Sequence, residues 1–195
     1  TMQHAVVKLF PYAKGRYQFI NRGRHEFPEN FAIRLREAID NMAKLKLTHT
    51  EKEYLRETCP YLDPTYLDFL QGYRYDPSEV TIEQVGNEVK VSIEGFWYRT
   101  ILWEVPIMAL ICELFYKETK QERHADELVI QTVEDKIKKY RDLDIVFAEF
   151  GTRRRHSHEV HDLVVKTLKD KGEGTFIGTS NVYLAMKYNT KPIGT

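Results

Sequence analysis

The sequence has 195 residues, of which 42% are hydrophobic and 12% aromatic, enough apolar material for one or two domains with packed cores. Its 29 lysines and arginines balance 29 aspartates and glutamates, so no overall field favours nucleic acid or a membrane surface as a partner. No apolar run reaches the roughly 20 residues of a membrane span, and no segment has the pattern of a signal peptide. Cys59 and Cys112 lack metal or redox spacing, which fits a reducing compartment, so we expect a cytoplasmic protein.

Residues 1–120 predict a mixed α+β module. Its helices are indicated by apolar residues at helical spacing and by start signals such as the capping-box pair Thr48 and Glu51. Alternating apolar residues on both sides of Gly86 predict a β-hairpin. The predicted elements are helices at 2–10, 31–47, after Thr48, after Asp63–Pro64 and at 97–117, and strands at 17–20, 80–85 and 89–93. None of them brings catalytic side chains together.

A charged stretch with few hydrophobic residues, 117–126, separates this module from the rest of the chain. We place the domain boundary there, with residues 1–120 as the amino-terminal module and 121–195 as the beginning of an α/β domain. Both ends of the chain interrupt a pattern, since 2–10 is already helical and the last predicted strand stops at Thr195. We therefore expect the chain to be part of a longer protein.

Residues 145–157 combine a strand, a turn and a cluster of positive charge. The segment 145–150 is apolar without alternation apart from Glu149, which is typical of a strand covered on both faces in a parallel sheet. An amphipathic helix follows, with Ser157 as its N-cap and Gly172 expected to close it in the left-handed conformation. Between strand and helix stand three consecutive arginines, Arg153, Arg154 and Arg155.

A Gly-Thr pair recurs at the end of each predicted strand of the second part, at Gly151–Thr152, Gly178–Thr179 and Gly194–Thr195. The intervening helices require parallel strands, so all three pairs should lie at one edge of a sheet. That edge is where α/β folds place ligand sites, because small residues expose backbone amides and threonines add hydroxyl donors. Guanidinium groups bind phosphate or carboxylate through paired hydrogen bonds, so the arginines predict an anion site there.

Other kinds of site are less well supported. The arginine triplet has an alternative as a solvated charge run or a salt-bridge cluster, and only its position after a strand favours function. The sequence has no mononucleotide P-loop, no dinucleotide fingerprint and no nucleophile elbow. We expect no metal site, because three histidines near the helix start lack zinc-protease spacing and are expected to be solvated: His156, His158 and His161.

Five motifs resemble the nicotinate phosphoribosyltransferases, a type II phosphoribosyltransferase family, and together they span nearly the whole chain. These motifs are Thr1–Val6, Ile101–Pro106, Phe150–Arg155, Phe176–Asn181 and Pro192–Thr195. The resemblance implies an α/β fold in which an amino-terminal α+β module is followed by the first βα units of an irregular α/β barrel. The implied reaction joins nicotinate to 5-phosphoribosyl 1-pyrophosphate in NAD salvage, giving nicotinate mononucleotide and pyrophosphate, and is coupled to ATP hydrolysis through a phosphorylated histidine.

The same resemblance implies roles for particular residues. Phe150 would face the pyridine ring, Arg153 would contact a substrate carboxylate or phosphate, and Thr195 would contact nicotinate. The residues implied on the phosphoribosyl side are Arg153, Arg154, Gly178, Thr179, Ser180 and Asn181. ATP would be a co-substrate, Mg²⁺ would be carried by pyrophosphate, and a homodimer is expected, with no nucleic acid or membrane partner.

Two functional segments of the family are expected outside this sequence. The phosphorylated histidine would follow Thr195 by three residues, and an Asp-x-Tyr-Lys segment would precede residue 1, so this 195-residue piece carries no catalytic residue and is expected to be inactive alone. Two alternatives stay open. One is a related enzyme that uses nicotinamide or quinolinate, and the other is a non-catalytic anion- or RNA-binding module, which would need aromatic stacking partners beside a basic groove.

Overall fold

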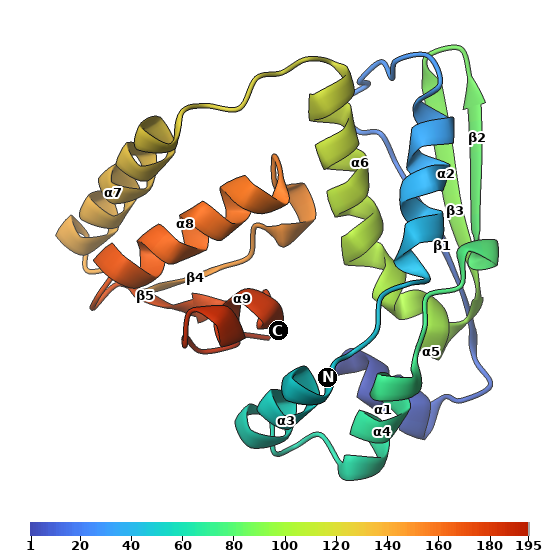
Figure 1. The fold of residues 1–195 in the computed structure, drawn as a ribbon, viewed down its shortest axis with the longest axis horizontal. Helices are drawn as coiled ribbons and strands as arrows, with labels where there is room; N and C mark the ends of the chain where they lie inside the picture. Colours follow the sequence, from blue (N-terminus) through green and yellow to red (C-terminus); the bar gives the residue numbers. More distant parts are fainter. Residues whose placement is uncertain (195) are drawn as a thin grey trace. The chain divides into compact units, whose positions relative to one another are not determined.

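The structure is a computed structural model that describes residues 1–194, and its fold is mixed α/β, as predicted (Figure 1). Contacts within the chain divide it into two compact units, Thr1–Gln121 and Glu122–Thr195, here called unit 1 and unit 2. Each unit contains a hydrophobic core. In the part of the chain that the structure describes, no helix has both the length and the apolarity needed to cross a membrane.

Unit 1 contains an antiparallel sheet in the order β1 (Lys14–Gln18), β3 (Glu88–Phe96), β2 (Val80–Val85). The pairing of Val85 with Glu88 makes the β2–β3 connection a tight hairpin, as predicted. Gly86 begins its turn at a φ of 58°, a left-handed conformation that glycine adopts without strain.

Two helices cover one face of this sheet, α2 (Phe31–Met42) and α6 (Glu104–Glu118) (Figure 1). Alternate residues of β2 and β3 point into the core beneath them, which is the period expected of strands with one solvated face. Burial of these side chains is the main stabilising contribution in this unit. The core consists of Phe27, Phe31, Leu35, Ile39, Val80, Val89, Val91, Ile93, Trp103, Ile107 and Ile111.

The shorter helices of unit 1 begin at the signals that the sequence contains. Thr48 and Glu51 form the predicted capping box, and the Asp63 carboxylate accepts from the Tyr66 amide at the start of the helix that Pro64 opens. Both predictions are confirmed. These elements are α1 (Met2–Leu9), α3 (His49–Thr58), α4 (Pro64–Gly72) and α5 (Trp97–Thr100), with 3₁₀ turns η1 (Pro77–Glu79) and η2 (Ile101–Trp103).

Three predictions for unit 1 need correction. The helix expected at 97–117 is broken into α5, η2 and α6, because Pro106 has no N–H to bond the carbonyl of Leu102 and tolerates only the first turn of a helix. The helix expected at 31–47 ends at Met42. The strand expected at 17–20 lies earlier, because its register is set by pairing with β3 and begins at Lys14.

Unit 2 alternates helices and strands in the order α7, β4, η3, α8, β5, α9. β4 and β5 pair in parallel, and Pro192 forms a further parallel bridge to Thr179, so the three predicted strands are parallel as expected. α7 was not predicted. The bounds are α7 (Asp126–Asp142), β4 (Phe147–Glu149), η3 (Thr152–Arg154), α8 (His158–Lys171), β5 (Phe176–Thr179) and α9 (Val182–Lys187).

The core cluster of unit 2 lies between its strands and two of its helices, α7 and α8. Phe147 and Phe176 pack against α7 and α8. In contrast, Val146, Phe150 and Ile177 each expose about half of their surface. The prediction that segment 145–150 is covered on both faces is therefore wrong for the described residues, since Val146 and Phe150 each expose about half of their surface.

The start of α8 follows the prediction and its end does not. Ser157 Oγ accepts from the Val160 amide at 3.2 Å, which confirms the N-cap. Gly172 lies at the C-cap with a φ of −90°, so the expected left-handed conformation is wrong, and the chain uses φ 79° at Gly174 instead. Gly172 is needed for another reason, because a Cβ atom there would collide with the carbonyl oxygen of Leu168.

Candidate anion-binding site

The carboxyl ends of the unit 2 strands meet at one edge. Glu149, the last residue of β4, is paired with Thr179 of β5. Thr179 in turn accepts from the amide of Ile193 at 2.9 Å and donates its own amide to the Lys191 carbonyl at 3.1 Å. The pairs Gly151–Thr152 and Gly178–Thr179 and the residue Gly194 therefore lie at the same end, which confirms that prediction for the described residues. Thr195, with its predicted contact to nicotinate, lies outside them.

The second Gly-Thr pair lies inside β5 rather than beyond its end. Gly178 has a φ of 148°, and a Cβ atom there would collide with the carbonyl oxygen of Lys191. Glycine is thus required for the close approach of the neighbouring chain. Thr179 is fully buried, and its hydroxyl donates to Glu149 Oε2 at 2.5 Å. Both residues have a clear role within the fold.

The carboxylate of Glu149 joins three segments at this edge. Oε1 accepts from the amide of Gly151, in the turn after β4, and Oε2 accepts from the hydroxyl of Thr179. His161 of α8 places Nε2 at 3.1 Å from Oε1. The main-chain carbonyl of Glu149 also accepts from the amide of Ser180 at 2.8 Å. One buried residue therefore sets the separation of both turns and the helix.

The surroundings of Glu149 favour its ionised form. Burial by itself would raise the pKa of this carboxyl, but the nearby His161 ring and the Thr179 hydroxyl outweigh burial, so the pKa lies below its ordinary value. A charge with only 8% of its residue exposed is stable because donors surround it. The network is therefore a preorganised part of the edge.

The histidines of this region do not behave alike. His161 is 3% exposed, so the prediction that it is solvated is wrong. It lies on the same face of α8 as Val165 and Leu168, at the i, i+4 and i+7 positions, and this face is buried. His158 is exposed, as expected. Among the described residues, no group of three His, Cys, Asp or Glu side chains is arranged to hold a metal ion.

The arginine triplet begins in the short 3₁₀ turn η3, between the Gly151 turn and α8. Arg153 and Arg154 are exposed, and Arg155 is half-buried. The backbone amide of Arg154 donates to the Gly151 carbonyl at 3.0 Å, but among residues 1–194 its side chain makes no hydrogen bond or ion pair, so its guanidinium retains all its donors. Phe150, at the same turn, exposes half of its surface.

Two further predicted residues connect the turns. Asn181 donates from Nδ2 to Thr152 Oγ1 at 3.2 Å, while its Oδ1 caps α9 by accepting from the Leu184 amide at 3.0 Å. Ser180 is tied to β4 through its amide. The structure thus gathers at one edge the residues Phe150, Arg153, Arg154, Gly178, Thr179, Ser180 and Asn181. Sequence reasoning missed the partners Glu149 and His161, although a single charge in an apolar strand was a signal for the former.

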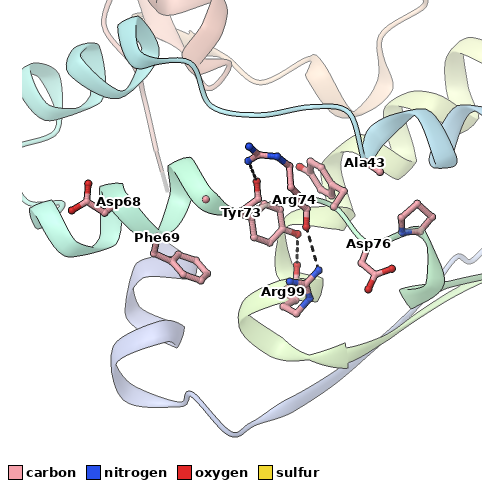
Figure 2. A pocket seen from close by; sticks show the side chains of 10 residues that line it. Ala43, Asp68, Phe69, Tyr73, Arg74, Asp76 and Arg99 are labelled. Atoms are coloured by element: carbon pink, nitrogen blue, oxygen red, sulfur yellow. Dashed lines mark hydrogen bonds between the residues drawn. The ribbon is translucent and has the colours of Figure 1, made fainter.

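A concave surface lies in unit 1 and contains none of the predicted residues. It is a hollow of about 730 Å³ at the end of α4, with Tyr73, Arg74 and Arg99 grouped on its wall (Figure 2). Arg99 is bound to Glu79, and Arg74 donates to the carbonyls of Gln71 and Tyr73. Its arginines are used by the fold, so the edge of unit 2 is the better candidate for an anion.

Parallel strands joined by helices, with glycine-containing turns and exposed arginines at their carboxyl ends, place this part of the chain among the α/β proteins. Comparisons with known proteins identify the family. Residues 1–112 match the model of the nicotinate phosphoribosyltransferase N-terminal domain, and residues 145–195 match the model of the nicotinate phosphoribosyltransferase family. The chain belongs to the nicotinate phosphoribosyltransferase family.

Individual relatives agree with the family models. The chain is 58% identical over all its residues to a nicotinate phosphoribosyltransferase from Chromohalobacter salexigens and 46% identical to one from Desulforapulum autotrophicum, and it spans 50% of each. It also resembles the crystal structure of nicotinate phosphoribosyltransferase from Porphyromonas gingivalis, with a TM-score of 0.93 and 41% identity, covering the whole chain and 50% of that structure. The chain therefore spans about half the length of these relatives.

Proposed function

We propose that the protein carrying this chain joins nicotinate to 5-phosphoribosyl 1-pyrophosphate, giving nicotinate mononucleotide and pyrophosphate in NAD salvage. The observation that carries the proposal is the family match. The whole chain aligns with a nicotinate phosphoribosyltransferase at 58% identity, and two models of that family match most of it. The exposed arginines beside the turn after β4 support it, because both substrates are anions.

The chemistry is a displacement at the anomeric carbon. Positive charge develops on the ribose as pyrophosphate leaves, so the protein needs mainly to position the two substrates and to neutralise charge. Within this chain we assign Arg153 and Arg154 to the anionic groups and Phe150 to the pyridine ring. Backbone and side-chain donors at Gly178, Thr179, Ser180 and Asn181 would line the phosphoribosyl side, and Thr195 would contact nicotinate.

We extend the proposal to ATP hydrolysis coupled through a phosphorylated histidine beyond Thr195. Mg²⁺ would enter with pyrophosphate as part of the substrate. A homodimer is the expected assembly, which light scattering of the purified full-length protein would test.

The test of the proposed function uses the full-length protein with nicotinate and 5-phosphoribosyl 1-pyrophosphate, with and without ATP and Mg²⁺. Formation of nicotinate mononucleotide and pyrophosphate in equal amounts is the expected result. Nicotinamide and quinolinate serve as competing pyridines, since one is neutral and the other carries two carboxylates. If the protein turned over nicotinamide or quinolinate faster than nicotinate, that pyridine would be assigned as the substrate in place of nicotinate.

A further inference from the structure

We propose that Glu149 is a positioning residue for the anion-binding edge, and that it acts by locking the turn after β4 to the end of β5. The inference rests on the proposed function for its substrate but on the structure for its geometry. A positioning role does not require Glu149 to touch a ligand. It requires that the ligand-contacting groups move out of position when the carboxylate of Glu149 is lost.

The contacts of Glu149 are arranged in the way such a role requires. Its two carboxylate oxygens are divided between segments, since Oε1 binds the Gly151 amide and Oε2 binds the Thr179 hydroxyl. The Gly151 turn leads directly into η3, whose residues include Arg153. Ser180 is fixed to the backbone of Glu149 at 2.8 Å. Loss of the carboxylate would therefore release the arginine turn from β5 while leaving the backbone bond.

A buried carboxylate beside an anion site would be unfavourable without compensation, because like charges repel more strongly at low dielectric constant. Here the compensation is built in. His161 Nε2 lies 3.1 Å from Oε1, although neither ring nitrogen makes a well-aligned hydrogen bond within the described residues. The hydroxyl of Thr179 and the amide of Gly151 bind the carboxylate directly. The negative charge is thus directed into the protein rather than towards the edge.

The glycine at the turn supports the same inference. A Cβ atom on Gly151 would lie 2.5 Å from Glu149 Oε1 and 3.9 Å from Cδ2 of His161. No side chain fits between the carboxylate and this turn. Glycine here allows the backbone amide to reach the carboxylate, so the identity of this residue and the position of Glu149 are linked.

The proposal is tested with Glu149→Gln in the full-length protein, because glutamine keeps the volume and an acceptor for the Gly151 amide but removes the charge. Inorganic phosphate and pyrophosphate are the probes, with affinity measured by calorimetry. We expect about a tenfold weaker affinity for both and a similar rise in KM for 5-phosphoribosyl 1-pyrophosphate, with kcat changed much less. Glu134→Gln is the matched control, a glutamate of the same unit paired at the surface with Lys171, and it should leave both constants unchanged.

Thr179 provides a second route that remains informative if Glu149→Gln unfolds. Thr179→Val removes the hydroxyl that binds Oε2, whereas Thr179→Ser keeps it and should retain phosphate affinity. If Thr179 acts through Glu149, the effects of Thr179→Val and Glu149→Gln on phosphate affinity will not add in the double variant. Additive losses would show that Thr179 acts on the ligand directly and would overturn the proposed connection.

The outcomes separate this proposal from the proposed function. If the parent converts nicotinate but Glu149→Gln binds phosphate equally well, even at a lower melting temperature, Glu149 is merely structural and the positioning role is overturned. If the parent binds phosphate, loses affinity on Glu149→Gln and does not convert nicotinate, the positioning role stands and the function fails. A parent that binds neither phosphate nor pyrophosphate would overturn the edge as an anion site, and this proposal with it.

Discussion

The two arginine-bearing surfaces of this protein differ in what their charges are bound to. In the hollow of unit 1, Arg99 is paired with Glu79 and Arg74 donates to backbone carbonyls (Figure 2). At the edge of unit 2, the side chain of Arg154 makes no hydrogen bond or ion pair with any residue that the structure describes. A guanidinium whose donors are bound by the fold has few left for a ligand. In this protein, a guanidinium group without a partner in the fold is therefore a better guide to an anion site than a concave surface.

The acidic residues of the two surfaces sharpen this contrast. Glu79 binds the Nε–H of Arg99 with one carboxylate oxygen and the indole N–H of Trp103 with the other, at 2.9 Å. Burial would lower the pKa of Arg99, but the bond to Glu79 outweighs burial and raises it. Glu149 instead accepts hydrogen bonds from the backbone amide of Gly151 and the hydroxyl of Thr179, with His161 as its neighbour. The carboxylate of unit 1 neutralises its arginine, whereas the carboxylate of unit 2 binds the Gly151 amide and the Thr179 hydroxyl.

The largest expected effect comes from breaking the charge pair of unit 1. Glu79→Ala leaves Arg99 and Trp103 without their acceptor, and because the pair is only partly buried, its loss should cost about 3 kcal/mol of unfolding free energy. Phosphate affinity should not change. Chemical denaturation and calorimetry of the full-length protein measure the two quantities, and Glu83→Ala, an exposed glutamate of β2, is the control. Weaker phosphate binding in Glu79→Ala would contradict the division between the surfaces.

The opposite pattern is expected at the edge of unit 2. Arg153→Ala removes a charge-assisted bond worth roughly 1.5–3 kcal/mol, so kcat/KM should fall at least about tenfold while the melting temperature changes little. Arg74→Ala is the matched arginine from unit 1, and it should leave catalysis unaffected. Steady-state kinetics on the full-length protein compare the two. Unchanged kinetics for Arg153→Ala would show that Arg153 has only a structural role, like Arg74 and Arg99 in the hollow.

Local sequence signals predicted where helices begin, whereas features that depend on contacts between distant residues were not predicted. Thr48, Asp63 and Ser157 each cap a helix through a bond to a residue three positions later, so the sequence alone contains the information. The need for glycine at Gly178 comes from Lys191, thirteen residues away, through a close approach that no local pattern encodes. The candidate edge was predictable because parallel strands align their ends whatever the details of packing.

The buried network behind the edge was not predictable in the same way. Glu149 was visible as a lone charge in an apolar strand, but its partner Thr179 follows it by thirty residues. His161 was expected in solvent because it stands near a helix start beside other polar residues. Its burial is decided by the packing of one face of α8, and helical spacing to Val165 and Leu168 was the signal that could have shown it.

Acid should affect the edge through Glu149. Its folded-state pKa is lowered, so its contribution to stability is complete above the ordinary glutamate pKa of about 4.3 and is lost as the pH falls through the lower folded-state value. The parent should therefore be more stable than Glu149→Gln by about 1.5 kcal/mol at neutral pH, with the gap closing at acidic pH. Melting curves from pH 7 to pH 2 measure this difference. A gap that widens on acidification would mean that the neutral carboxyl is the favoured form.

The smallest effects compare one helix cap from each unit. Thr48 caps α3 and Ser157 caps α8, each by accepting from an amide at 3.2 Å, so Thr48→Ala and Ser157→Ala should each cost about 1 kcal/mol of unfolding free energy. Only Ser157 lies close to the arginine turn, three residues after Arg154. Fraying at the start of α8 should loosen that turn and weaken phosphate binding by a few-fold, whereas Thr48→Ala should leave it unchanged. Equal phosphate affinity in both variants would show that the turn is held from β4 alone, and so would assign its position to the Gly151 amide and Glu149.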